Sequence, residues 1–324
     1  MNQPLMWGGL IYEEIPGYPG AHGSTLTEAP NGDIVAAWYA GAYEKAKDVA
    51  IFISRLPKGE KEWTKPEILN DAEGLSEGNP VLFTGPDGTM WFFYVVMYGD
   101  TWNDCKVHYR TSADGGKTWG GEETLIKKKG WMTRNHPLVL ENGTFLLPIY
   151  NEMLYTPGFL LTRDDWKNTK RTGTSLRAPG GLIQPTVVQL SDGSLLTYFR
   201  SAEQSDKKNI WMSTSQDGGL NWTDPARTSL PNPDAAVDLV KLQNGHLVLI
   251  YNHSSVSRLP LSAALSTDEG KTWSVRRDLE DEGGSYSYPS VIQASDGTIH
   301  VTYTYRRLSI KHVAFSEEWI KQKQ

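Results

Sequence analysis

The sequence predicts an all-β fold, a six-bladed β-propeller with four-stranded antiparallel blades, and two repeated features carry this prediction. The first is an Asn-Gly or Asp-Gly turn followed by a long apolar run, found at Gly32, Gly88, Gly143, Gly193, Gly245 and Gly297. The second is a tryptophan that recurs at Trp63, Trp119, Trp166, Trp222, Trp273 and Trp319. The turns are 50 to 56 residues apart and the tryptophans 46 to 56, which is the length of a propeller blade. Both features therefore count six blades.

Each repeat unit reads as four short strands, of which the second, after the turn, is apolar almost throughout. The last unit lacks room for its fourth strand, because only five residues follow Trp319. An open ring would leave unpaired sheet edges, which are prone to aggregation. We therefore expect residues 10–15 to complete the last blade, and residues 1–324 to form a single domain.

A third motif, Ser-x-Asp-x-Gly-x-Thr/Asn-Trp, stands in full at Ser112–Trp119, Ser215–Trp222 and Ser266–Trp273. The aspartate can accept hydrogen bonds from backbone N–H groups of its own turn, and the glycine can adopt a positive φ. We therefore interpret the motif, an Asp box, as a structural turn at the outer side of its blade. The other blades retain only its tryptophan.

Composition excludes several classes of protein. The net charge of −6 and the pI near 5.7 argue against nucleic acid as a partner, and no apolar run approaches 18 residues, which argues against a membrane span. With one cysteine and no H-x-x-x-H spacing, we expect no disulfide, no metal and no cofactor. The first seven residues carry no signal-peptide pattern, which predicts a cytoplasmic protein, or a secreted or periplasmic one if a signal was removed.

The candidate site follows from strand direction, because the start of each first strand and the end of each second strand lie at the same mouth. Nine residues before the turn glycines stand Gly23, Asn79, Arg134, Gln184, Ala236 and Tyr288. Proline follows at positions 80, 185 and 289, which we read as the first residues of strands. Other polar and aromatic residues expected at this mouth are His22, Glu44, Asp48, Trp102, His136, Arg200, Asp238, Arg258 and Arg306.

Several arginines at one mouth favour an anionic ligand, because the guanidinium group binds a carboxylate through two parallel hydrogen bonds. A structural alternative stays open for each, since Arg134, Arg200 and Arg258 could pair with Asp48, Asp234 or Asp238. His22 could likewise be a buried structural histidine, and Tyr288 could hold a strand end through its hydroxyl.

The Asp boxes, the six-fold repeat and the order of the mouth residues together resemble the sialidase superfamily across essentially the whole chain. The stretch from Gln184 to Arg200 is similar to the one that carries a glutamate and the second of three substrate-binding arginines. Arg258 resembles the third arginine, and Tyr288-Pro289-Ser290 the nucleophile segment. The resemblance implies that Arg200 and Arg258 bind the sugar's carboxylate and that Tyr288 is the nucleophile. It implies Asp48 as the acid/base, with Glu44 as its rival.

Two positions depart from the family pattern. The first arginine aligns with His22, and the glutamate that would assist the tyrosine aligns with Gln184, which cannot take up a proton. A phenol has a pKa of about 10 and is a poor nucleophile near neutral pH without a base. His22 could replace either missing group.

Three functions remain open at this point. The first is an exo-acting glycoside hydrolase on a terminal acidic sugar, such as a sialic acid or a related acid, within an oligosaccharide or glycan. The second is a lyase on uronic-acid glycans, in which arginines neutralise the carboxylate and His22 or Tyr288 removes the α-proton. The third is a sugar-binding propeller without catalytic activity. Lyase action creates an unsaturated sugar that absorbs in the ultraviolet and hydrolysis does not, so products distinguish them.

Overall fold

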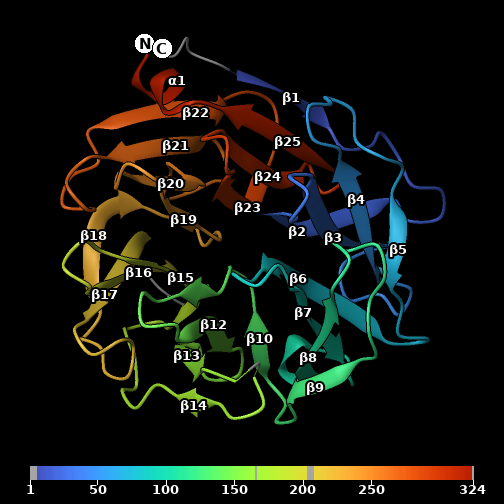
Figure 1. The fold of residues 1–324 in the computed structure, drawn as a ribbon, viewed down its shortest axis with the longest axis horizontal. Coiled ribbons are helices and arrows are strands. Elements are labelled where there is room, and N and C mark those ends of the chain that lie inside the picture. The colour runs from blue at the N-terminus through green and yellow to red at the C-terminus, as the bar shows by residue number, and fades with distance from the viewer. Residues whose placement is uncertain (1–5, 165, 203–207, 323–324) are drawn as a thin grey trace. The chain divides into compact units, whose positions relative to one another are not determined.

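The computed structural model describes residues 6–164, 166–202 and 208–322. Its strands form six small antiparallel sheets, five with four strands and one with five. Each sheet is built mainly from strands that are consecutive in the chain, which is the sheet composition of a six-bladed β-propeller (Figure 1). The predicted fold class is confirmed.

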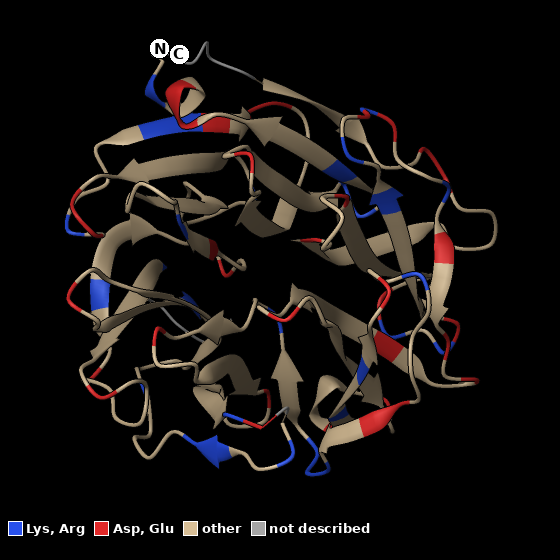
Figure 2. Ribbon diagram, in the orientation of Figure 1, with Lys and Arg blue, Asp and Glu red and all other residues tan. Residues whose placement is uncertain are grey.

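The first two sheets follow the predicted pattern of four strands on each repeat. The first sheet contains β2 (Gly20–Glu28), β3 (Ile34–Gly41), β4 (Ala50–Leu56) and β5 (Glu67–Asn70), and the second contains β6 (Ser76–Thr84), β7 (Met90–Met97), β8 (Cys105–Ser112) and β9 (Glu123–Ile126). A short 3-10 helix, η1 (Trp102–Asp104), precedes β8. The second strands β3 and β7 are buried along their whole length and carry no charged residue (Figure 2). They pack in one apolar cluster, in which Val35 and Ala37 of β3 meet Phe92 and Tyr94 of β7.

The next three sheets show one irregularity, because two short strands replace the first strand of the third sheet. That sheet contains β10 (Trp131–Thr133), β11 (Leu138–Val139), β12 (Phe145–Asn151), β13 (Thr156–Thr162) and β14 (Lys170–Arg171). The fourth contains β15 (Leu182–Gln189), β16 (Leu195–Ser201), β17 (Asn209–Ser215) and β18 (Ala226–Pro231), and the fifth contains β19 (Asp238–Lys241), β20 (Leu247–Asn252), β21 (Leu261–Ser266) and β22 (Val275–Glu280).

The last sheet joins the first and the last of the described strands. Its order is β1 (Met6–Leu10), β25 (Ser309–Phe315), β24 (Ile299–Tyr305) and β23 (Tyr286–Gln293), and a five-residue helix, α1 (Glu317–Lys321), follows. β1 runs antiparallel beside β25, with Met6 opposite Phe315 and Leu10 opposite Lys311 (Figure 1). An N-terminal strand therefore completes this sheet as predicted, but it lies earlier than residues 10–15. The reason is that Trp7, from β1, packs its ring against His312, with ring centroids 5.3 Å apart.

The Asp boxes are turn-forming motifs, as predicted. In the first, one carboxylate oxygen of Asp114 accepts hydrogen bonds from the N–H groups of Lys117 and Thr118, at 3.0 and 2.9 Å. The hydrogen bond from the Thr118 hydroxyl, together with these two, holds the pKa of Asp114 well below its usual range. A fourth turn makes the same kind of contact without the full motif, because the Thr162 hydroxyl and the Asn168 N–H donate to Asp164 at 2.7 and 3.0 Å. The expectation that this blade keeps only its tryptophan was therefore wrong.

The chain divides into two compact units, Met1–Thr133 with Tyr288–Trp319, and Arg134–Ser287 with Ile320–Gln324. The single domain over residues 1–324 stays a prediction. Among the residues that the structure describes, no helix is long and apolar enough to span a membrane.

Candidate active site

The first strands of several sheets share an internal bulge at the position that the sequence singled out. The pairing register shifts between His22 and Thr25 in β2, between Gly78 and Val81 in β6, and between Ile183 and Thr186 in β15. The residues at this position have left-handed backbones, with φ of 64° at Gly23, 43° at Asn79, 53° at Gln184 and 55° at Tyr288.

The prolines that follow three of these positions lie inside strands rather than at their first residues, so that expectation was wrong. Pro80 is in β6, Pro185 in β15 and Pro289 in β23. A bulge takes a residue out of the hydrogen-bond ladder, and proline has no N–H to donate to it. A left-handed backbone costs a non-glycine residue roughly 1–2 kcal/mol, and such conformations concentrate at functional sites. The left-handed backbone therefore marks Asn79, Gln184 and Tyr288 as more than strand residues.

In the first unit, the bulge of β2 places His22 against Tyr288. Their ring centroids are 4.0 Å apart, and the ring of Tyr39 makes an edge contact with His22 at 5.6 Å. The His22 Nδ1 atom lies 2.9 Å from the Thr304 hydroxyl, to which the N–H of Gly23 also donates at 3.1 Å. All of these side chains are buried. The structure thus holds the imidazole of His22 and the phenol of Tyr288 in ring contact, and the hydrogen bond to Thr304 fixes the orientation of the imidazole.

A cavity of about 520 Å³ opens in this unit beside His22. At its wall the Arg307 guanidinium donates to the Glu44 carboxylate at 2.5 Å. The cavity therefore combines a carboxylate, a guanidinium, an imidazole and phenols. Its lining includes His22, Tyr39, Tyr43, Glu44, Arg307 and Leu308.

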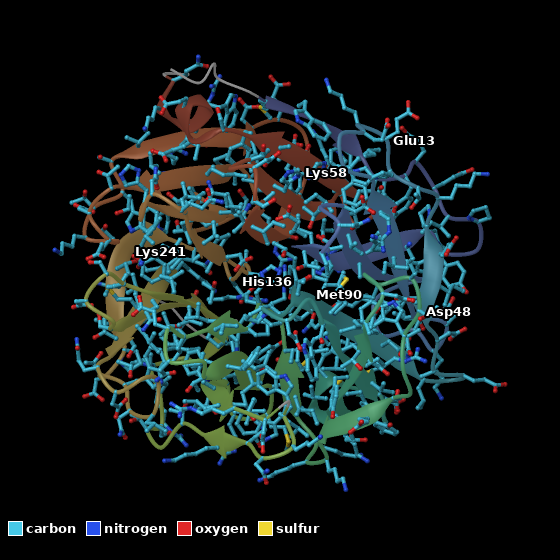
Figure 3. The ribbon with its side chains drawn as sticks, viewed as in Figure 1. Glu13, Asp48, Lys58, Met90, His136 and Lys241 are labelled. Carbon is cyan, nitrogen blue, oxygen red and sulfur yellow. The ribbon has the colours of Figure 1, made fainter. Side chains whose placement is uncertain are left out.

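The two acid/base candidates differ in their surroundings. Glu44 lines the cavity together with His22, whereas Asp48 lines a second cavity, of about 820 Å³, which Glu44 also lines. Both carboxylate oxygens of Asp48 accept the N–H of Ala42, at 3.3 and 3.1 Å. Figure 3 places Asp48 near the outer strand β5. Asp48 therefore closes its own loop, and Glu44 is the carboxylate beside the imidazole.

The remaining residues predicted in this unit are Asn79, Trp102 and Arg306. The Asn79 carbonyl accepts the Thr133 hydroxyl at 3.2 Å. Trp102 packs edge-on against Tyr39, with ring centroids 6.3 Å apart. The Arg306 guanidinium instead stacks over the ring of Tyr305 at 5.1 Å and is absent from the cavity lining, which its neighbour in sequence, Arg307, joins.

In the second unit, Asp234 holds both predicted carboxylate-binding arginines. The Arg200 Nε and Nη2 atoms lie 2.8 and 2.7 Å from one Asp234 carboxylate oxygen, and Arg258 Nη2 donates to the Asp234 carbonyl at 3.2 Å. Arg258 also donates to the Ser287 hydroxyl at 3.4 Å. The Arg200–Asp234 pairing matches the structural alternative for this arginine, and it also fixes the guanidinium in one orientation.

Gln184 also contacts Arg200, whose Nη1 donates to the side-chain oxygen of Gln184 at 3.0 Å. Its amide nitrogen donates in turn to the Tyr150 hydroxyl at 3.4 Å. Gln184 is 1% exposed. It therefore acts as a buried acceptor for an arginine, a role in which an amide oxygen serves as well as a carboxylate oxygen.

The buried side-chain amide of Asn135 links the segment of Arg134 and His136 to the bulge in β15 and to the residue before Asp238. Asn135 donates to the carbonyls of Pro185 and Val237 at 3.0 and 3.2 Å, and the neighbouring Arg134 is 2% exposed. The His136 Nδ1 atom lies 3.6 Å from an Asp238 carboxylate oxygen. The structure thus brings His136 and Asp238 together, and it buries Arg134 beside the hydrogen-bonded Asn135.

Sequence reasoning gave no role to Tyr43 and Leu308, which line the cavity together with Arg307. They stand in the β3–β4 loop and the β24–β25 turn, where no repeat or spacing marks a residue. No group of His, Cys, Asp and Glu side chains that could hold a metal ion occurs among the residues described.

The two curated relatives of this chain are both sialidases. The chain is similar to the sialidases of Micromonospora viridifaciens, with 24% identity over 94% of this chain and 52% of that protein, and of Bacteroides fragilis, with 21% identity over 87% and 58%. It thus spans a little over half the length of these relatives.

Solved structures with a similar fold have low sequence identity to this chain. The NanB sialidase of Streptococcus pneumoniae superposes with a TM-score of 0.83 and 12% identity, over 96% of this chain and 71% of that one. A protein of unknown function from Dyadobacter fermentans superposes with a TM-score of 0.80 and 17% identity, over 95% and 97%. The model of the BNR repeat-like domain matches residues 32–301. The chain therefore belongs to the BNR repeat-like domain family, within the sialidase superfamily.

Proposed function

We propose that this protein is an exo-acting glycoside hydrolase that removes a terminal acidic sugar, such as a sialic acid, from a glycan. The observation that carries the proposal is the arrangement of His22 and the Glu44–Arg307 pair along one cavity, with the ring of Tyr288 in contact with His22. It offers a proton donor, a cationic group for a carboxylate, and a nucleophile beside a base, which are the groups that glycoside hydrolysis needs.

Carboxylate binding is assigned to arginines. The resemblance to sialidases assigns it to Arg200 and Arg258, whose guanidinium groups are held by Asp234. The first arginine of the family pattern is His22 in this chain, and we assign its role to Arg307 in the cavity wall. A guanidinium group can bind the carboxylate of a sugar bidentately.

The chemistry is assigned to Tyr288, His22 and Glu44. The Tyr288 oxygen attacks the anomeric carbon while His22 takes up the phenol proton, a task that Gln184 cannot perform. The glycosidic bond breaks, its electron pair goes to the leaving oxygen, and Glu44 supplies that oxygen with a proton. Water then attacks the same carbon, gives its proton to Glu44, and frees the Tyr288 oxygen, which regains its proton from His22.

The lyase alternative draws on the same contact, because an imidazole and a phenol side by side can remove an α-proton and protonate a leaving group. In that reaction the α-carbon proton goes to His22, a C=C bond forms, and the glycosidic oxygen leaves with a proton from Tyr288. The product differs from that of hydrolysis because it contains a new double bond.

The test is incubation of the full chain with sialosides and with uronate oligosaccharides, read by reducing-end release and by ultraviolet absorbance. Reducing ends from a sialoside without new absorbance are expected. Absorbance from a uronate substrate would establish the lyase instead. Binding without turnover on any substrate would leave a sugar-binding protein.

A further inference from the structure

Two large apolar side chains stand at the rim of the cavity that holds Glu44 and Arg307. Tyr43 is 70% exposed and Leu308 is 60% exposed, and both line the cavity. They are the neighbours in sequence of the two ion-paired residues, whose contact joins the β3–β4 loop to the β24–β25 turn. The cavity therefore has a charged wall and an apolar rim.

The loop that carries Tyr43 is closed by its own hydrogen bonds. Ala46 donates its N–H to the Tyr43 carbonyl at 3.0 Å, and Asp48 accepts the N–H of Ala42. The Lys45 ammonium lies 5.9 Å from the centre of the Trp102 ring. An exposed aromatic ring on a fixed loop loses little conformational freedom when a ligand covers it. These contacts make Tyr43 a preorganised platform, and they give Asp48 a positioning role.

The turn that carries Leu308 is equally short and closed. The Leu308 N–H donates to the Tyr305 carbonyl at 3.0 Å, and the two residues between them have left-handed backbones, with φ of 55° at Arg306 and 59° at Arg307. This tight turn directs Arg307 to Glu44 and leaves Leu308 at the rim.

We propose that Tyr43 and Leu308 form a subsite for the uncharged sugar to which the terminal acidic sugar is linked. The inference rests on the proposed function. A pyranose ring presents one face of C–H groups, which packs on an aromatic ring, and its hydroxyls remain in water. The acidic sugar lies against the charged wall, and the neutral sugar that follows it covers Tyr43 and contacts Leu308. This subsite selects the leaving group and hence the type of glycan.

The test compares two ligands that share the acidic sugar. Binding of 3′-sialyllactose and of the methyl α-glycoside of sialic acid is measured by calorimetry, in the full chain with Tyr288→Phe to prevent turnover. We expect the trisaccharide to bind about tenfold more tightly, the factor that one aromatic stack supplies. Adding Tyr43→Ala should bring the two affinities to within about twofold, whereas Tyr43→Phe should keep the difference. Ile68→Ala is the control, since Ile68 is also exposed, at 50%, but stands on β5 outside the cavity.

The outcomes separate the subsite from the function. If both ligands bind equally before Tyr43 is changed, or if Tyr43→Ala keeps the tenfold difference, the subsite is rejected and the proposed function survives. If neither ligand binds, the proposed function is rejected and the subsite with it.

Discussion

The imidazole of His22 and the phenol of Tyr288 are in ring contact, with centroids 4.0 Å apart and planes inclined by 50°. His22 pairs with Tyr39 of β3 just before the bulge in β2, and the Thr304 hydroxyl lies 2.9 Å from its Nδ1 atom. Tyr288 approaches from β23 with a left-handed backbone. The bulge in β2 and the left-handed backbone of Tyr288 in β23 thus together produce the contact between the two rings.

His22→Gln and Tyr288→Phe should each lower kcat on a sialoside by a factor of about 100 or more, the contribution expected of a base or a nucleophile. His22→Gln should also change the pH dependence of kcat, which a merely structural histidine would not. His246→Gln, in the turn before β20, is the control and should change neither. Full kcat with an unchanged pH profile in His22→Gln would exclude it as the base.

Glu44→Gln should affect substrates according to their leaving groups. Loss of a general acid is expected to lower turnover of a natural glycoside by about 100-fold, but that of an activated aryl glycoside by far less, because a good leaving group needs no proton. Steady-state kinetics with both substrates measures the difference. Asp48→Asn is the matched comparison, and we expect it to reduce both activities by a similar factor. The reverse pattern would make Asp48 the acid.

Gly23→Ala should destabilise the protein by at least about 2 kcal/mol, because it combines a left-handed backbone with a clash. The added Cβ would lie 2.5 Å from Cε1 of Tyr39, at a position where φ is 64°. Urea unfolding measures the change. Gly121→Ala should stay within about 0.5 kcal/mol of the wild type, since the Cβ it adds would meet no atom within 4 Å. Equal stabilities of the two variants would show that the bulge tolerates a side chain there.

The free energy of unfolding of the wild type should fall as pH rises through about 7, and Glu77→Gln should abolish this decrease. Burial raises the pKa of the Glu77 carboxyl to about 7, and Asn70 is the hydrogen-bond donor to one of its oxygens. A carboxyl with a folded pKa above its unfolded pKa favours folding fully below the unfolded value, and this contribution disappears as pH rises through about 7. The loss has an upper limit of roughly 3 kcal/mol.

Chemical unfolding at pH 5 and at pH 8 measures this effect. Glu73→Gln, at an exposed position nearby, should keep the wild-type dependence. His108 is a second buried titratable group in this blade, and burial lowers its pKa, so the comparison is made as the difference between wild type and variant. The same pH dependence in Glu77→Gln and wild type would mean that the carboxyl ionises without cost.

Deleting residues 1–10 should lower the free energy of unfolding by at least about 3 kcal/mol, because it exposes the edge of β25 and removes the contacts of a partly buried ring. β1 pairs with β25 over five residues, and Trp7 packs against His300 and His312. Trp7→Ala should account for much of the loss, whereas Met6→Ala, at a 41% exposed position, should have little effect. An unchanged melting temperature after the deletion would contradict the role of β1.

The repeats made the fold predictable, because each Asn/Asp-Gly turn and each tryptophan reports a local structure that the chain makes six times. The prediction of the fold failed where one contact that is not repeated determines the local structure. The place of β1 depends on Trp7 meeting two histidines, and the fourth Asp-box turn uses Thr162 in place of serine.

The candidate site was predictable to the extent that it follows the repeat. The position nine residues before each turn led to Gln184 and Tyr288, and the structure shows the bulge that makes this position special. Residues on loops had no such guide. Asp48 and Glu44 are both acidic and four residues apart, and only the hydrogen bonds to Ala42 and Arg307 distinguish them.

The recurring left-handed bulge has a consequence for how this scaffold can change its chemistry. The backbone at Asn79, Gln184 and Tyr288 is already strained, and the strain belongs to the strand path rather than to the side chain. Exchanging one non-glycine residue for another at these positions leaves the strain almost unchanged, so the fold tolerates different side chains there. Glutamine in place of glutamate at position 184 therefore changes the chemistry of the side chain and leaves the backbone that holds it intact. The substrate of the site can diverge in this way while the blades keep their structure.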